Sequence, residues 1–144
     1  MVVPSIITCF AVEDSDFIYL SGPDIKDDYG YSNFCEYIKF DTKTKTMYLS
    51  VKKDCLSGRF FQYDYTHFVS PLTDEEQEYI DQRENLLKQS KKIVVEEGVY
   101  YILDEYFHDL TNLEKIVLPD SLIRIGEYAF YNCSKLKSVY CKNV

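Results

Sequence analysis

The chain has 144 residues, of which 46% are hydrophobic and 28% are charged, so it can form one domain or two small ones around a real core. Its formal net charge is −8, and the acidity lies in residues 1–89, which hold sixteen acidic and nine basic side chains. Because a nucleic-acid-binding surface is basic, this balance argues against direct nucleic-acid binding. It leaves two interpretations open, a solubilising surface or an acidic surface that meets a basic protein.

The start of the chain predicts a protein that is neither secreted nor membrane-bound. Residues 1–8 lack a basic segment, Glu13 and Asp14 follow closely, and a membrane span needs about 20 apolar residues. The cysteines are odd in number, without a CxxC pair, which favours free thiols in a reducing compartment; they are Cys9, Cys35, Cys55, Cys133 and Cys141. We therefore expect a cytoplasmic protein, unless a signal peptide was removed from a precursor.

Residues 4–69 predict an antiparallel sheet of about five strands. Apolar and polar residues alternate in short runs that are separated by turn residues, as in half-buried strands. The expected strands are residues 6–12, 17–20, 35–41, 46–52 and 59–69.

The segment 21–34 between two of these strands is a predicted loop, because it is rich in Gly, Pro, Asp and Asn. A calcium loop starting at Asp24 would place Lys26 at its third position, so the calcium template fails. Aromatic rings beside acidic groups suit a protein contact, although the rings could instead fold back onto the sheet. The candidate contact residues are Asp24, Asp27, Asp28, Tyr29, Tyr31 and Phe34.

A helix is predicted from Thr73 to about Ser90. Thr73 and Glu76 form a capping box, with acidic residues in the first turn. The apolar stripe of this helix consists of Tyr79, Ile80, Leu86 and Leu87. We expect the helix to join the two halves of the chain.

The C-terminal part repeats itself. Residues 90–112 align without a gap over residues 113–135, with Lys92 on Lys115, and the pattern restarts at Leu136. A fixed period of 23 residues predicts a solenoid, in which each unit buries its apolar side against the next. Each unit should hold a short strand and, at residues 128–133 of the second unit, one helical turn on the convex side.

The second unit resembles the BspA-like class of leucine-rich repeats. The matching residues are Leu113, Ile116, Leu118, Pro119, Ile125, Gly126, Ala129, Phe130 and Cys133. The first unit departs from the pattern at four places, where Glu96, Leu103, Tyr106 and Leu110 stand for proline, glycine, alanine and cysteine. The resemblance covers about residues 90–144 and implies a solenoid of about two and a half units. It also implies protein-binding or adhesive roles without catalytic residues.

The predicted fold is therefore α+β: an N-terminal antiparallel β-sheet with a linking helix, followed by a short leucine-rich-repeat solenoid. The domains are residues 1–70 (antiparallel β), 71–90 (capping and linking helix) and 91–144 (repeats). Because solenoids need caps, we expect the helix to cover the open end of the first repeat. The last repeat lacks a capping element, and its strand edge could pair with a second copy as a homodimer.

Motifs for catalysis, metal binding or cofactor binding are missing from the sequence. His67 and His108 have no partner at metal-ligand spacing, and there is no GxSxG, HExxH or glycine-rich phosphate loop. We expect a protein that is not an enzyme and has no metal or cofactor. The least favoured alternative is a Cys-dependent enzyme that uses Cys55 and His67.

The predicted binding surface is the concave sheet of the repeats. Its outward rows are Lys92, Lys115 and Ser138 in one, and Val94, Val117 and Tyr140 in the next; the alternative is a merely solvated surface. The function hypothesis is a non-enzymatic protein-binding module. Its most concrete form is a small acidic intracellular inhibitor or adaptor, encoded by a phage and directed against a basic, nucleic-acid-binding host defence enzyme. The alternative is a surface adhesion protein of the repeat family.

Overall fold

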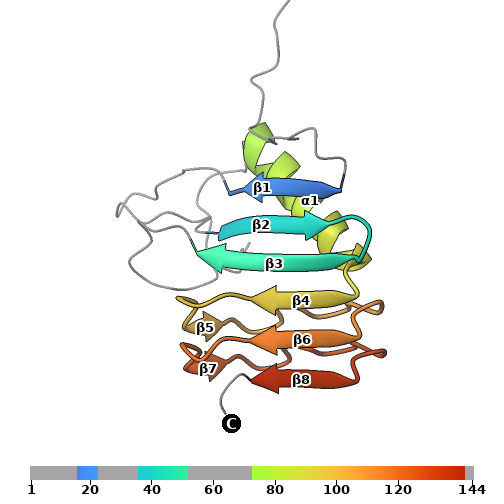
Figure 1. Cartoon of the computed structure of the whole chain (residues 1–144). Coiled ribbons are helices and arrows are strands. Elements are labelled where there is room, and N and C mark those ends of the chain that lie inside the picture. Colours follow the sequence, from blue (N-terminus) through green and yellow to red (C-terminus); the bar gives the residue numbers. More distant parts are fainter. Residues whose placement is uncertain (1–15, 23–35, 52–72, 142–144) are drawn as a thin grey trace, which may run out of the picture.

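A six-stranded mixed sheet with one helix behind it forms the described part of the molecule (Figure 1). The computed structural model describes residues 16–22, 36–51 and 73–141. In chain order the elements are β1 (Phe17–Ser21), β2 (Glu36–Asp41), β3 (Thr46–Val51), α1 (Asp74–Gln89), β4 (Lys92–Val95), β5 (Tyr101–Ile102), β6 (Lys115–Leu118), β7 (Arg124–Ile125) and β8 (Ser138–Cys141).

The sheet combines two kinds of strand pairing. Its strand order is β1-β2-β3-β4-β6-β8, antiparallel from β1 to β3 and parallel from β3 to β8. The parallel part arises because each repeat unit returns the chain to the start of the next strand. β5 and β7 form a second, two-stranded parallel sheet at the far side of the repeat units (Figure 1). The chain is thus α+β, as predicted.

The repeat register follows the 23-residue offset. Lys92 lies opposite Lys115, which lies opposite Ser138 on β8. The neighbouring positions Ile93 and Ile116 point inward and are fully buried. The stacking of β4, β6 and β8 predicted from the sequence is therefore confirmed.

The convex side of each unit differs from the prediction. Residues 127–132 form turns rather than a helical turn, because Tyr128 (φ 55°) and Asn132 (φ 56°) have left-handed backbones. Glu105 and Asp109 repeat this geometry 23 residues earlier, with φ of 58° and 60°. A left-handed residue every four positions stops α-helical hydrogen bonding from propagating.

Helix α1 has the capping box that the sequence predicts. The Thr73 side chain accepts from the Glu76 amide, and the Glu76 carboxylate accepts from the Thr73 amide at 2.7 Å. The predicted apolar stripe is buried, and the helix lies behind β1–β3 (Figure 1).

The open end of the first repeat is covered by β3, not by α1 as the sequence suggested. The Lys45 carbonyl accepts from the Lys91 and Lys92 amides at 2.9 and 3.3 Å. In the same way, the Lys91 carbonyl accepts from the Glu114 and Lys115 amides at 2.8 and 3.2 Å. The β2–β3 hairpin therefore takes the place of a preceding repeat, because a strand satisfies the backbone groups of β4 and a helix cannot.

A buried polar cluster joins the hairpin, the helix and the first repeat. The Glu36 carboxylate on β2 accepts from the Tyr79 hydroxyl at 2.6 Å, and also from the Tyr106 hydroxyl. Arg83 lies 2.6 Å from the same carboxylate and stacks 4.6 Å from the centre of the Tyr106 ring. Burial raises the pKa of both tyrosines. Burial alone would lower the pKa of Arg83, but its interactions with Glu36, Tyr106 and Tyr79 together outweigh that effect and raise this pKa.

Other parts of the predicted N-terminal sheet fall on residues that the structure leaves undescribed. Three of the five expected strands correspond to β1, β2 and β3. The expected strands at 6–12 and 59–69 and most of the loop 21–34 lie outside the described residues, and the division into three domains stays a prediction. In the described part of the chain, no helix is long and apolar enough to cross a bilayer.

Candidate functional site: the open face of the sheet

One face of the sheet forms the core, and the other faces away from it. Along each strand alternate residues point inward, so β2 buries Ile38 and Phe40, while β3 buries Met47 and Leu49. The residues between them point to the opposite side, where no described element is layered over the sheet (Figure 1).

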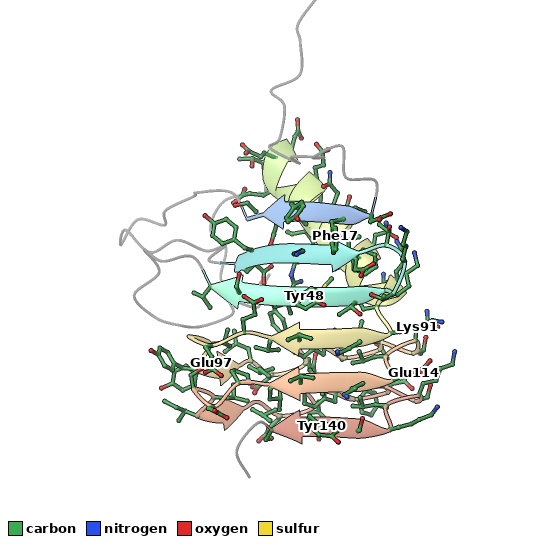
Figure 2. All side chains as sticks on the ribbon, viewed as in Figure 1. Phe17, Tyr48, Lys91, Glu97, Glu114 and Tyr140 are labelled. Atoms are coloured by element: carbon green, nitrogen blue, oxygen red, sulfur yellow. The ribbon has the colours of Figure 1, made fainter. Side chains whose placement is uncertain are left out.

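The outward side chains line up in rows across all six strands, and we call this surface the open face. Strand register sets one row as Phe17, Asp41, Thr46, Lys92, Lys115 and Ser138, of which Thr46 is buried. It sets the next as Tyr19, Lys39, Tyr48, Val94, Val117 and Tyr140. Figure 2 shows Phe17, Tyr48 and Tyr140 on this side of the sheet.

The structure brings together the repeat residues that the sequence proposed as partner-binding. Lys92, Val94, Lys115, Val117 and Tyr140 lie on three adjacent strands, in the two predicted rows. Their role in binding stays a prediction. The six loop candidates, Asp24, Asp27, Asp28, Tyr29, Tyr31 and Phe34, lie outside the described residues.

The sequence missed that the N-terminal strands extend the same rows. Thr46 pairs with Lys92, which is 46 residues later, or two repeat lengths. Extending the 23-residue offset two steps upstream would therefore have found β3. Met47 and Leu49 also match the inward residues Ile93 and Val95.

Lysine ammonium groups lie over aromatic rings at both ends of the open face. Lys39 Nζ is 4.5 Å from the ring centre of Phe17, 6.0 Å from Tyr19 and 5.8 Å from Tyr48. Lys115 Nζ is 4.5 Å from the ring centre of Tyr140. Such cation–π contacts are each worth about 0.5–1 kcal/mol at exposed sites and limit the freedom of the lysines.

A hollow of about 410 Å³ lies at the β1–β3 end of the open face. Its outward lining mixes aromatic, hydroxyl and charged groups: Tyr19, Ser21, Tyr37, Lys39, Tyr48, Ser50 and Glu96. An aromatic hollow beside a flatter aliphatic surface can take a bulky side chain of a protein partner.

The surroundings of Cys133 and His108 bear on whether the described residues hold a reactive thiol or a metal site. Cys133 donates from its thiol to the Phe107 carbonyl at 3.1 Å, and burial raises the pKa of this thiol, which lowers its reactivity at neutral pH. His108 is exposed, and within the described ranges no group of His, Cys, Asp and Glu could hold a metal ion. Cys55 and His67 lie outside those ranges.

The last described strand leaves its outer edge unpaired within the described sheet. β8 pairs with β6 on one side only, and Val139 and Tyr140 are 48% and 58% exposed. The homodimer through this edge stays a prediction.

Comparison with known proteins identifies the repeats. A family model described as a BspA type leucine-rich repeat region (6 copies) matches residues 84–144. The C-terminal part of the chain is thus similar to BspA-type leucine-rich repeats, as its sequence predicts. The family model covers β4 to β8 and the end of α1, so the strands that build half of the open face lie within the matched residues.

A solved structure agrees with this identification at the level of fold. A leucine-rich repeat protein from Eubacterium ventriosum ATCC 27560 superposes with a TM-score of 0.55 at 16% sequence identity. The match covers 88% of this chain and 26% of that protein, so this chain spans about a quarter of its length. No curated protein matches the sequence.

Proposed function

We propose that the chain is a protein-interaction module that binds its partner on the open face. The observation that carries this proposal is the continuity of two outward rows across six strands. They combine aromatic rings, aliphatic groups and fixed lysines on a surface that no described element covers. Aromatic residues contribute much of the binding energy in protein–protein interfaces, and this surface presents several of them.

The central patch of the proposed surface is formed by Val94, Val117 and Tyr140. These residues are adjacent across β4, β6 and β8, and Tyr140 is 58% exposed. A partner that covers them removes apolar area from water, which contributes about 25 cal/mol per Å².

Protein binding without catalysis is common to both specific forms of the hypothesis. One is a small intracellular inhibitor or adaptor, encoded by a phage and directed against a host enzyme. The other is a surface adhesion protein, which is equally consistent with BspA-type repeats. The binding-face test below applies to both forms, and a test of where the native chain resides separates them.

The test places a photo-crosslinking amino acid at Val117 on the open face and, as a matched control, at Glu78 on the exposed side of α1. In the native host, we expect a discrete crosslinked protein from position 117 and none from position 78. The Val94→Asp/Val117→Asp double variant should abolish the crosslink from a probe at position 140. Equal crosslinking from both positions would contradict the proposal.

A further inference from the structure

The open face carries a charge opposite to that of the whole chain. Six of the sixteen basic side chains lie on this face or at the end where β3, β4, β6 and β8 begin. We call these six the basic band; its members are Lys39, Lys45, Lys91, Lys92, Lys115 and Lys137. Figure 2 shows Lys91 at this end of the sheet, together with Glu114.

Among the described residues, the acidic groups near the basic band are fewer than its six lysines, and apart from Glu96 in the hollow beside Lys39 they are already engaged. The Asp41 carboxylate accepts from the Lys43 and Thr44 amides in the hairpin turn, and these contacts lower its pKa. Glu114 lies 4.0 Å from Lys137, and Asp16 pairs with Lys43 at 2.6 Å outside the band. The band therefore keeps a net positive charge on a chain whose formal charge is −8.

The central lysines of the band have no acidic partner within the described part of the chain. Among the residues that the structure describes, Lys39, Lys92 and Lys115 have no carboxylate within ion-pair distance. Lys92 and Lys115 also lie directly opposite each other on β4 and β6, and like charges in that arrangement destabilise a sheet. An acidic partner would remove this repulsion on binding.

The lysines also argue against a nucleic acid as the ligand. Single-stranded nucleic acids bind to sheets by stacking bases on free aromatic faces. Here Lys39 and Lys115 lie over the rings of Phe17 and Tyr140.

We infer that the partner presents an acidic protein segment to the open face. This inference rests on the proposed function and gives the chemistry of its partner. Lys39 and Lys115 are three strand spacings apart, on β2 and β6, which is about 14 Å. An extended segment that crosses the strands places carboxylates at this spacing when they are about four residues apart. The net charge of the whole chain suggests a basic partner instead. The two hypotheses therefore predict peptides of opposite charge.

The test selects random 12-residue peptides, displayed on phage, against the immobilised full chain. The face variant is Lys39→Gln/Lys92→Gln/Lys115→Gln. The matched control is Lys88→Gln/Arg124→Gln/Lys135→Gln, which removes three exposed positive charges away from the open face. Thermal unfolding of both variants checks that they are folded.

We expect the wild-type chain to select peptides rich in Asp and Glu. The dissociation constant of the best peptide should rise at least tenfold in the face variant and less than threefold in the control. It should also rise with salt concentration, as for a charge-dependent contact.

Three outcomes would overturn the inference. The first is a peptide pool that is unenriched or basic, and the second is an equal loss of binding in both triple variants. The third is a 20-nucleotide oligo(dT) that binds the open face more tightly than the best peptide. Neutral peptides that bind and are lost in Val94→Asp/Val117→Asp would overturn the charge inference alone. They would leave the proposed function in place.

Discussion

The two complete repeat units, residues 90–112 and 113–135, have matching strands and convex-side turns but different neighbours. Both have a four-residue strand, a two-residue strand and left-handed residues at matching positions. The second unit packs on the first, whereas the first packs on the β2–β3 hairpin and α1. The comparison shows that the residues of a repeat unit depend on the element against which its N-terminal side packs.

Three departures of the first unit from the BspA-type pattern have a physical reason in this packing. The Glu96 amide donates to the Leu49 carbonyl of β3 at 2.8 Å, which a proline could not do. The Tyr106 hydroxyl reaches Glu36, where an alanine would leave a gap. Leu103 has no described unit before it, so its side chain does not meet the backbone that Gly126 meets in the second unit.

The largest effect is expected at the junction of the hairpin and the first unit. Glu36→Gln removes the charge that Arg83 faces at 2.6 Å and should lower the free energy of unfolding by about 3–5 kcal/mol, the cost of an unpaired buried charge. Chemical denaturation measures this loss. Glu84→Gln, at an exposed pair with Lys88, is the control and should cost less than about 1 kcal/mol. A small effect at Glu36 would mean that the cluster does not hold the junction.

The contact between the two units is tested by Gly126→Ala. The added Cβ would lie 2.3 Å from the Asp104 backbone nitrogen, and this overlap should cost about 3 kcal/mol of stability. Gly98→Ala is the matched control, because it meets no atom within 4 Å and strains only a φ of +95°, at about 1 kcal/mol. Equal losses at both glycines would contradict the close stacking of the units.

Restoring the family pattern in the first unit should weaken it. Glu96→Pro removes the amide that donates to the Leu49 carbonyl, and we expect a loss of about 2 kcal/mol from the broken bond and the unpaired carbonyl. Glu96→Ala keeps the amide and should change stability by less than about 0.5 kcal/mol. If proline stabilised the chain, the hairpin would not act as the preceding repeat.

The smallest effect on stability is expected at the left-handed turn residues that both units share. Glu105 is exposed and has a φ of 58°, which glycine adopts without strain. Glu105→Gly should therefore raise the free energy of unfolding by about 0.5 kcal/mol, and the midpoint of thermal unfolding should rise slightly. Glu105→Ala, which cannot relieve the strain, should give no gain. Destabilisation by glycine would show that this turn is not left-handed in solution.

Features that depend on local spacing could be predicted from the sequence. The offset that places Lys92 on Lys115 fixes the strand register, and the capping box of Thr73 and Glu76 fixes the start of α1. The rows of the open face within the repeats follow from the same offset. These features depend on residues close in sequence or on an exact period, both of which can be counted.

The rest depends on which edges meet in space. Composition and alternation do not indicate that β3 pairs with β4; only the 23-residue offset, extended two steps upstream, places Tyr48 opposite Val94. The four-group cluster around Glu36 joins residues up to 70 positions apart, and no spacing rule links them. The local positive charge could not be seen in the net charge of −8, because it arises only when the strands align.

Backbone amide hydrogen exchange at the β3–β4 junction tests most directly whether the hairpin and the repeats form one sheet. The Lys91 amide donates to Lys45, as the Glu114 amide donates to Lys91, so both should exchange at similarly slow rates, as should the Glu96 amide. Fast exchange at Lys91 and Glu96 beside slow exchange at Glu114 would contradict the account. It would separate the hairpin from the repeats and divide the open face in two.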